Sequence, residues 1–109
     1  MRNDRYTYRV TWYQEDEEYA GLCAEFPSLS WMARTPEAAL RGIRKIVSGV
    51  VSDLISSGER IPEPISTRRF SGRFVVRVPP DVHRRLVQEA SESNISLNRL
   101  VSAKLSGES

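Results

Sequence analysis

The sequence predicts an α+β protein made of two small domains, and three observations support this fold class. Short runs within residues 6–33 alternate apolar and polar side chains, as strands with one buried face do. Residues 36–57 instead carry apolar side chains at helical spacing, and residues 73–105 have the pattern of one strand followed by two helices. Residues 61–71 contain prolines and polar side chains, which predicts a linker between the two domains.

The first domain, residues 1–60, begins with three predicted strands. Alternation predicts a strand over residues 6–13, a polar hairpin turn over 14–18 and a returning strand over 19–26. A third, short strand is expected over residues 29–33, after a proline break. One face of the returning strand carries four apolar residues: Ala20, Leu22, Ala24 and Phe26.

A long helix follows the strands. Thr35 is a suitable N-cap, Pro36 fits the first helical turn, and Gly58 suits the left-handed position just after the helix ends. The predicted buried stripe recurs at helical spacing: Ala39, Leu40, Ile43, Ile46, Val47, Val50 and Leu54. Gly42 and Gly49 lie on one face, where they either allow close packing or are simply tolerated.

The second domain, residues 72–109, opens with a predicted strand over residues 73–78. One face of this strand is apolar: Phe74, Val76 and Val78. The opposite face carries three other residues: Arg73, Val75 and Arg77. A lone strand leaves two open edges, so we expect two copies of the chain to pair these strands antiparallel in a two-fold dimer.

A two-stranded ribbon of this kind fits the DNA major groove, and its outward face is predicted to read bases. Arg73 and Arg77 have the fork geometry that binds guanine, whereas Val75 can offer apolar contact to a thymine methyl group. The alternative is a solvated arginine face on an ordinary dimerisation element. Two interpretations stay open for Arg68, Arg69 and Arg99: they contact DNA phosphates, or they only improve solubility.

Two short helices complete the second domain. The first is predicted over residues 80–93 with Asn94 as its left-handed C′ residue, and Ser96 N-caps the second, over residues 97–105. This order of one strand and two helices resembles the ribbon-helix-helix repressors, which bind DNA as dimers.

Charge differs between the two parts of the chain. Residues 1–66 hold 8 Lys/Arg and 10 Asp/Glu, whereas residues 67–109 hold 8 Lys/Arg and 4 Asp/Glu. A basic second part suits a polyanion, and a slightly acidic first part suits a basic protein partner. Cys23 is the single cysteine, which excludes a CxxC-type metal site, and no apolar run approaches about 20 residues. With no apolar signal region at the N-terminus, we expect a cytoplasmic protein without a membrane partner.

Three motifs in the first part resemble those of HicB-type antitoxins. They are residues 26–29 (FPSL), 35–40 (TPEAAL) and 58–64 (GERIPEP), in the order and spacing of that family. Residues 72–79 (GRFVVRVP) resemble the start of the ribbon-helix-helix domain that many members carry. The family usually has glycine at the positions of Ser28 and Ala33, so the turns around the third strand are expected to differ here.

The resemblance implies a first domain with a truncated, inactive ribonuclease-H-like β-β-β-α fold that binds and blocks a HicA-type mRNA-cleaving toxin. It implies a second domain that forms an intertwined dimer and represses the shared operon, and leaves open whether dimers pair further. It also implies that backbone N–H groups at the start of the last helix, at Ser96, Leu97 and Asn98, bind a DNA phosphate. Residues 65–72 are short for the additional sheet strand found in several relatives.

Catalysis is not expected, and no catalytic residue, metal or cofactor is predicted. Ribonuclease-H chemistry needs several carboxylates around divalent ions. Residues 15–18 lie in a predicted turn, whereas Glu25 and Asp53 lie on different elements and His83 in the other domain. Trp12 and Trp31 could stack on RNA bases, but core packing or burial by a partner is the favoured interpretation.

A second function stays open from the sequence. The chain could be a stand-alone ribbon-helix-helix regulator whose first domain binds a small ligand or only mediates oligomerisation. An adjacent reading frame for a small basic protein would favour the antitoxin.

Overall fold

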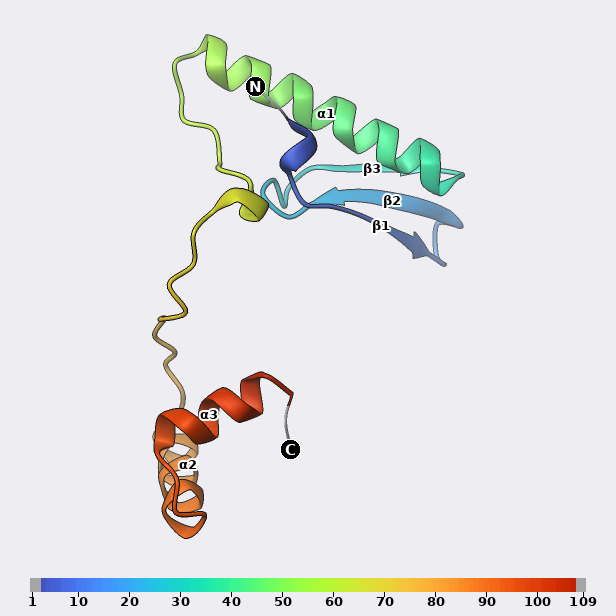
Figure 1. The fold of residues 1–109 in the computed structure, drawn as a ribbon. Helices are drawn as coiled ribbons and strands as arrows, with labels where there is room; N and C mark the ends of the chain where they lie inside the picture. Colours follow the sequence, from blue (N-terminus) through green and yellow to red (C-terminus); the bar gives the residue numbers. More distant parts are fainter. Residues whose placement is uncertain (1–2, 108–109) are drawn as a thin grey trace. The chain divides into compact units, whose positions relative to one another are not determined.

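The computed structural model describes residues 3–107 and divides the chain into two compact units, Met1–Phe70 and Ser71–Ser109 (Figure 1). The first unit contains three strands, one long helix and two 3-10 helices: η1 (Asn3–Arg5), β1 (Tyr8–Tyr13), β2 (Glu18–Cys23), β3 (Ser30–Ala33), α1 (Pro36–Ser56) and η2 (Ile65–Thr67). The second unit contains α2 (Pro80–Glu92) and α3 (Leu97–Leu105). The α+β class is confirmed, and the first unit has the predicted order of three strands and a helix.

The three strands form one antiparallel sheet in the order β1-β2-β3, and α1 covers one face of it (Figure 1). Val10, Gly21 and Trp31 lie opposite one another across the three strands. β1 begins at Tyr8, two residues later than predicted. The backbone N–H of Thr7 donates to the Glu25 side chain rather than to a neighbouring strand, which accounts for the later start.

Gly21 lets α1 approach the middle of the sheet. A Cβ atom at this position would collide with the backbone oxygen of Ala39 and lie 2.8 Å from Cγ2 of Ile43. The close approach buries one row of α1 side chains at i, i+4 spacing: Ala39, Ile43, Val47 and Val51. The predicted stripe is therefore wrong at its edges, because Leu40 is 37% exposed and Val51, which was not predicted, is 4% exposed.

β2 is shorter than predicted and ends at Cys23. Ala20 and Leu22 share a face as expected, but Gly21 and Cys23 are the residues that face α1. Ala24 is exposed, and Phe26 lies beyond the strand, where its ring packs edge-on against Tyr6 at a centroid distance of 5.3 Å. The alternation was correct, but periodicity alone does not identify the face that the helix covers.

Residues next to α1 in the sequence determine where this helix begins and ends. The Thr35 hydroxyl accepts a hydrogen bond from the backbone N–H of Ala38 at 3.1 Å, which confirms the predicted N-cap. Gly58 has a φ of +71°, and the N–H groups of Gly58 and Glu59 donate to the carbonyls of Ile55 and Leu54. These two bonds form a Schellman motif, so the helix stops where the glycine predicts.

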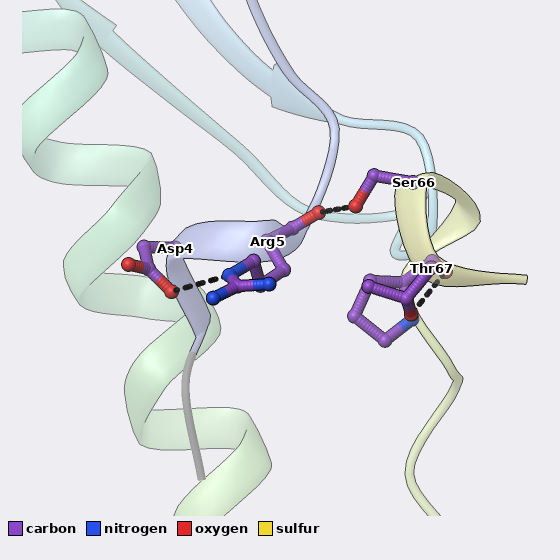
Figure 2. A network of polar contacts seen from close by, with 5 residues as sticks. Asp4, Arg5, Ser66 and Thr67 are labelled. Atoms are coloured by element: carbon purple, nitrogen blue, oxygen red, sulfur yellow. Dashed lines mark hydrogen bonds and ion pairs between the residues drawn. The ribbon is translucent and has the colours of Figure 1, made fainter.

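The chain after α1 returns along the first unit as a strap, residues 61–67. Its carbonyl at Pro62 accepts a hydrogen bond from the Tyr6 hydroxyl at 2.7 Å. Figure 2 shows the Ser66 hydroxyl donating to the carbonyl oxygen of Arg5, at 2.6 Å. The sequence places these residues in the linker, and the structure gives them hydrogen bonds to the first unit. Within residues 3–107 the strap forms no further sheet strand.

In the second unit α2 and α3 are joined by a tight turn. Asn94 has a φ of +58°, and the N–H groups of Asn94 and Ile95 donate to the carbonyls of Ser91 and Ala90 in a second Schellman motif. The Ser96 hydroxyl then accepts from the N–H of Arg99 at 3.1 Å, as predicted for the N-cap. An ion pair of 3.1 Å between Glu89 and Lys104 connects the two helices. Over residues 3–107, no helix combines the length and apolar character needed to cross a membrane.

Candidate nucleic-acid interface

The predicted reading strand, residues 73–78, has no regular secondary structure and pairs with no strand among residues 3–107 of the single chain. Its apolar face is bare, with Phe74 73%, Val76 62% and Val78 43% exposed. A strand needs a neighbour for its backbone N–H and C=O groups, and one chain supplies none here. The paired strand of the ribbon therefore stays a prediction.

An open apolar groove of about 600 Å³ lies beside this segment. Its walls come from the segment and from both helices: Val76, Val78, Leu86, Leu97, Val101 and Leu105. Among the described residues 71–107, the buried side chains are those of Ala90 and Leu100. The second unit thus exposes most of the apolar surface that would form a core.

The three residues predicted to read bases, Arg73, Val75 and Arg77, are all exposed, and Val75 is 92% exposed. The segment is preceded by a glycine turn in which Gly72 has a φ of +84°. The Ser71 hydroxyl accepts a hydrogen bond from the N–H of Arg73 at 3.1 Å, which holds the start of the segment. Both guanidinium groups are accessible to a polyanion.

The residues predicted to bind phosphate surround the start of α3. Ser96 caps the helix, and the side chains of Asn98 and Arg99 are exposed. Leu97 turns its side chain to the apolar groove, so its contribution to phosphate binding would come from its backbone N–H. The first turn of α3 therefore presents N–H groups and a positive dipole end on the basic unit.

Glu25 is the most strongly engaged acid in the first unit, and sequence reasoning missed its role. Its carboxylate accepts from the backbone N–H groups of Thr7 at 2.9 Å and Ile65 at 2.8 Å, and from the Thr7 hydroxyl at 3.0 Å. Burial alone would raise the pKa of Glu25, but these hydrogen bonds outweigh it and lower the pKa to about 2. Glu25 thus ties the start of β1 to the strap. An acid near the end of a predicted strand was the one signal in the sequence.

The remaining candidate acids do not converge. Residues 15–17 occupy the β1–β2 turn, Glu18 is the first residue of β2, and Asp53 is exposed on α1. Among residues 3–107, no three His, Cys, Asp or Glu side chains are grouped so that they could hold a metal ion. Cys23 is buried, and burial raises the pKa of its thiol. The acidic turn is therefore best described as a solvated surface of the first unit.

The two tryptophans are half-exposed. Trp12 packs edge-on against Tyr19 at 4.9 Å and donates from Nε1 to the Gln14 side chain at 2.9 Å. Trp31 is 46% exposed and packs on α1 at Gly42, where a Cβ atom would overlap its ring. Gly42 is therefore a close-packing glycine, whereas a Cβ at Gly49 would meet no atom within 4 Å.

A family model described as the HicB family matches residues 55–105, from the last turn of α1 to the end of α3. The match covers the strap and residues 71–105 of the second unit, and it supports a HicB-type protein with a function related to toxin–antitoxin systems. Comparisons with curated proteins and with solved structures found no match.

Proposed function

We propose that this protein is the antitoxin of a toxin–antitoxin pair. Its first unit binds and inhibits a HicA-type mRNA-cleaving toxin, and its second unit represses the operon by binding operator DNA as a ribbon-helix-helix homodimer. The protein acts through binding and performs no catalysis itself. Three features support this proposal: the family match, the basic second unit and the bare apolar segment at residues 73–78.

The observation that carries the proposal is the exposure of the apolar side of residues 73–78 next to the apolar groove. A second copy supplies both missing parts, because its equivalent segment completes a two-stranded ribbon and its helices cover Leu105, which is 66% exposed. About 40 residues rarely fold alone without such a partner.

In this dimer the ribbon enters the major groove with Arg73, Val75 and Arg77 facing the bases. Phosphates flanking the groove are bound by the N–H groups at the start of α3 and by Arg99. Base contacts determine the operator sequence, and phosphate contacts determine the position of the protein on it.

The first unit is the proposed toxin-binding part. Residues 1–66 hold 10 acidic and 8 basic side chains, a balance that suits a basic protein partner, and residues 15–17 form an exposed acidic turn. Because Glu25 is engaged in holding the strap, it contributes to the shape of this unit rather than to chemistry at its surface.

Two measurements on the full chain test the proposal. Sedimentation at micromolar concentration should show a dimer or a larger assembly, and the protein should retard DNA from upstream of its own gene. Affinity purification after co-expression should recover the product of an adjacent small reading frame. A monomer without DNA binding would refute the repressor, whereas DNA binding without toxin capture would favour a stand-alone regulator.

A further inference from the structure

An open groove of about 450 Å³ lies along α1 next to β3, on the first unit. Its apolar lining comes from Trp31, Ile46 and Val50, and nearly half of the Trp31 surface is exposed. A half-exposed tryptophan beside aliphatic side chains is the kind of surface that a protein partner buries. The DNA-binding role proposed above makes no use of it.

Gly42 and Gly49 determine the shape of this groove. The Trp31 ring packs directly on the helix backbone at Gly42. Gly49 has open space where its Cβ would be, so the α1 backbone is bare at that point. A glycine in the middle of a helix destabilises it by about 1 kcal/mol relative to alanine. Close packing against another backbone, which glycine permits, would offset this loss.

Two opposite charges lie at equal distances on either side of Gly49. Lys45 precedes it by four residues and Asp53 follows it by four, each about 6 Å away along the helix axis. Both side chains are exposed, and neither forms an ion pair with any residue in 3–107. The three residues lie on one i±4 ridge, with a cation at one end, an anion at the other and glycine at the midpoint.

Such a ridge is complementary to itself. A two-fold rotation about Gly49 places Lys45 of each copy opposite Asp53 of the other, and it places the two bare backbone positions together. A different protein would need to carry the same order of charges independently, whereas a second copy carries it by symmetry.

We propose that this face of α1 is a contact between two copies of the chain. The two α1 helices pack antiparallel and cross at Gly49, where glycine allows a short distance between their axes. Two Lys45–Asp53 ion pairs flank the crossing, and Trp31, Ile46 and Val50 of each copy become buried. This contact goes beyond the proposed function, because it joins first units, whereas the proposed DNA-binding dimer forms through second units.

Oxidative cross-linking of the full chain tests the crossing point. Gly49→Cys places a thiol on the two-fold axis, where two Cα atoms come within disulfide distance. Ser48→Cys is the matched control, because residue 48 is also exposed but lies about 100° around the helix from residue 49. Cys23 is 2% exposed and can remain in both proteins. We expect the Gly49→Cys chain to form covalent dimers at least about tenfold faster than the Ser48→Cys chain.

Charge exchange tests the two ion pairs. In the Gly49→Cys chain, adding Lys45→Glu sets carboxylates against carboxylates twice and should slow cross-linking about tenfold. Adding Asp53→Lys as well restores opposite charges and should recover the original rate. Arg41→Glu changes the net charge equally at an exposed α1 position outside the groove and should have little effect.

Equal cross-linking of the two cysteine variants, or a charge exchange that restores nothing, would overturn the contact. Binding of operator DNA by the Lys45→Glu chain is measured alongside, with circular dichroism to verify folding. Retained DNA binding with no charge-dependent cross-linking would reject this contact and leave the proposed repressor intact. Slower cross-linking after Lys45→Glu, together with recovery of the rate after Asp53→Lys is added, would support the contact whatever the result for DNA.

Discussion

Replacing Glu25 by Gln tests whether one carboxylate holds the strap to the sheet. In the native unit Oε1 accepts from the backbone N–H of Thr7, while Oε2 accepts from the Thr7 hydroxyl and from the backbone N–H of Ile65. A glutamine amide has one oxygen, so in either orientation its NH₂ group faces a backbone N–H. The substitution preserves side-chain size and removes the charge together with at least one acceptor.

The pKa of Glu25 bounds the cost of this substitution. A fall in the pKa of Glu25 from 4.5 to about 2 corresponds to at most about 3 kcal/mol of differential stabilisation of the charged form. The carboxylate is partly exposed, so water screens it, and we expect the free energy of unfolding of the first unit to fall by about 2 kcal/mol. Hydrogen bonds to a charged group contribute a similar amount.

Urea unfolding followed by tryptophan fluorescence measures this loss, because Trp12 and Trp31 both lie in the first unit. The pKa of Glu25 is lower in the folded than in the unfolded state. The contribution of Glu25 to the free energy of unfolding is therefore fully present above about pH 4.5 and is lost as pH falls toward 2. The difference between native and Glu25→Gln proteins should therefore shrink from pH 6 to pH 3. Glu63→Gln, an exposed change in the same strap, is the control. Equal stability at pH 6, or a difference that does not change with pH, would refute the reasoning.

Three further predictions concern packing, DNA reading and assembly. Gly21→Ala forces a methyl group against the α1 backbone and should destabilise the first unit by about 3 kcal/mol. Gly49→Ala in dilute protein should instead stabilise the first unit by up to about 1 kcal/mol. Urea unfolding measures both changes. Arg77→Ala should weaken cognate DNA binding by about 1–3 kcal/mol per contact and relax sequence preference. Arg69→Ala should weaken binding to all DNA sequences equally and lower the slope of log affinity against log salt concentration by about one. Unchanged operator binding by the Arg77→Ala chain would show that the strand does not read bases. The isolated second unit should melt at a temperature that rises with protein concentration, and a concentration-independent, folded monomer would contradict the ribbon.

Signals encoded within a few neighbouring residues were readable from the sequence. Thr35 and Ser96 cap α1 and α3, and Gly58 and Asn94 adopt the left-handed conformation after their helices. These features depend on local backbone chemistry, in which a short polar side chain satisfies an N–H group and a small residue tolerates a positive φ. The order of strands and helices was predictable for the same reason, because periodicity reports secondary structure directly.

Contacts between distant residues were decided by the tertiary structure. Periodicity gave α1 a broad apolar face, and the approach of its backbone to Gly21 selected the row from Ala39 to Val51 while leaving Leu40 at the surface. The hydrogen bond between Glu25 and Ile65 joins residues that are 40 positions apart in the sequence. No local sequence pattern predicts which backbone N–H groups a carboxylate will bind. The sequence by itself thus determined the helices with their caps and the order of the strands in the first unit. The fold decided which faces are buried and which polar groups meet, because both depend on how elements dock. The alternation of residues 73–78 predicts a strand that the single chain leaves unpaired, and the proposed dimer would take its partner from a second copy.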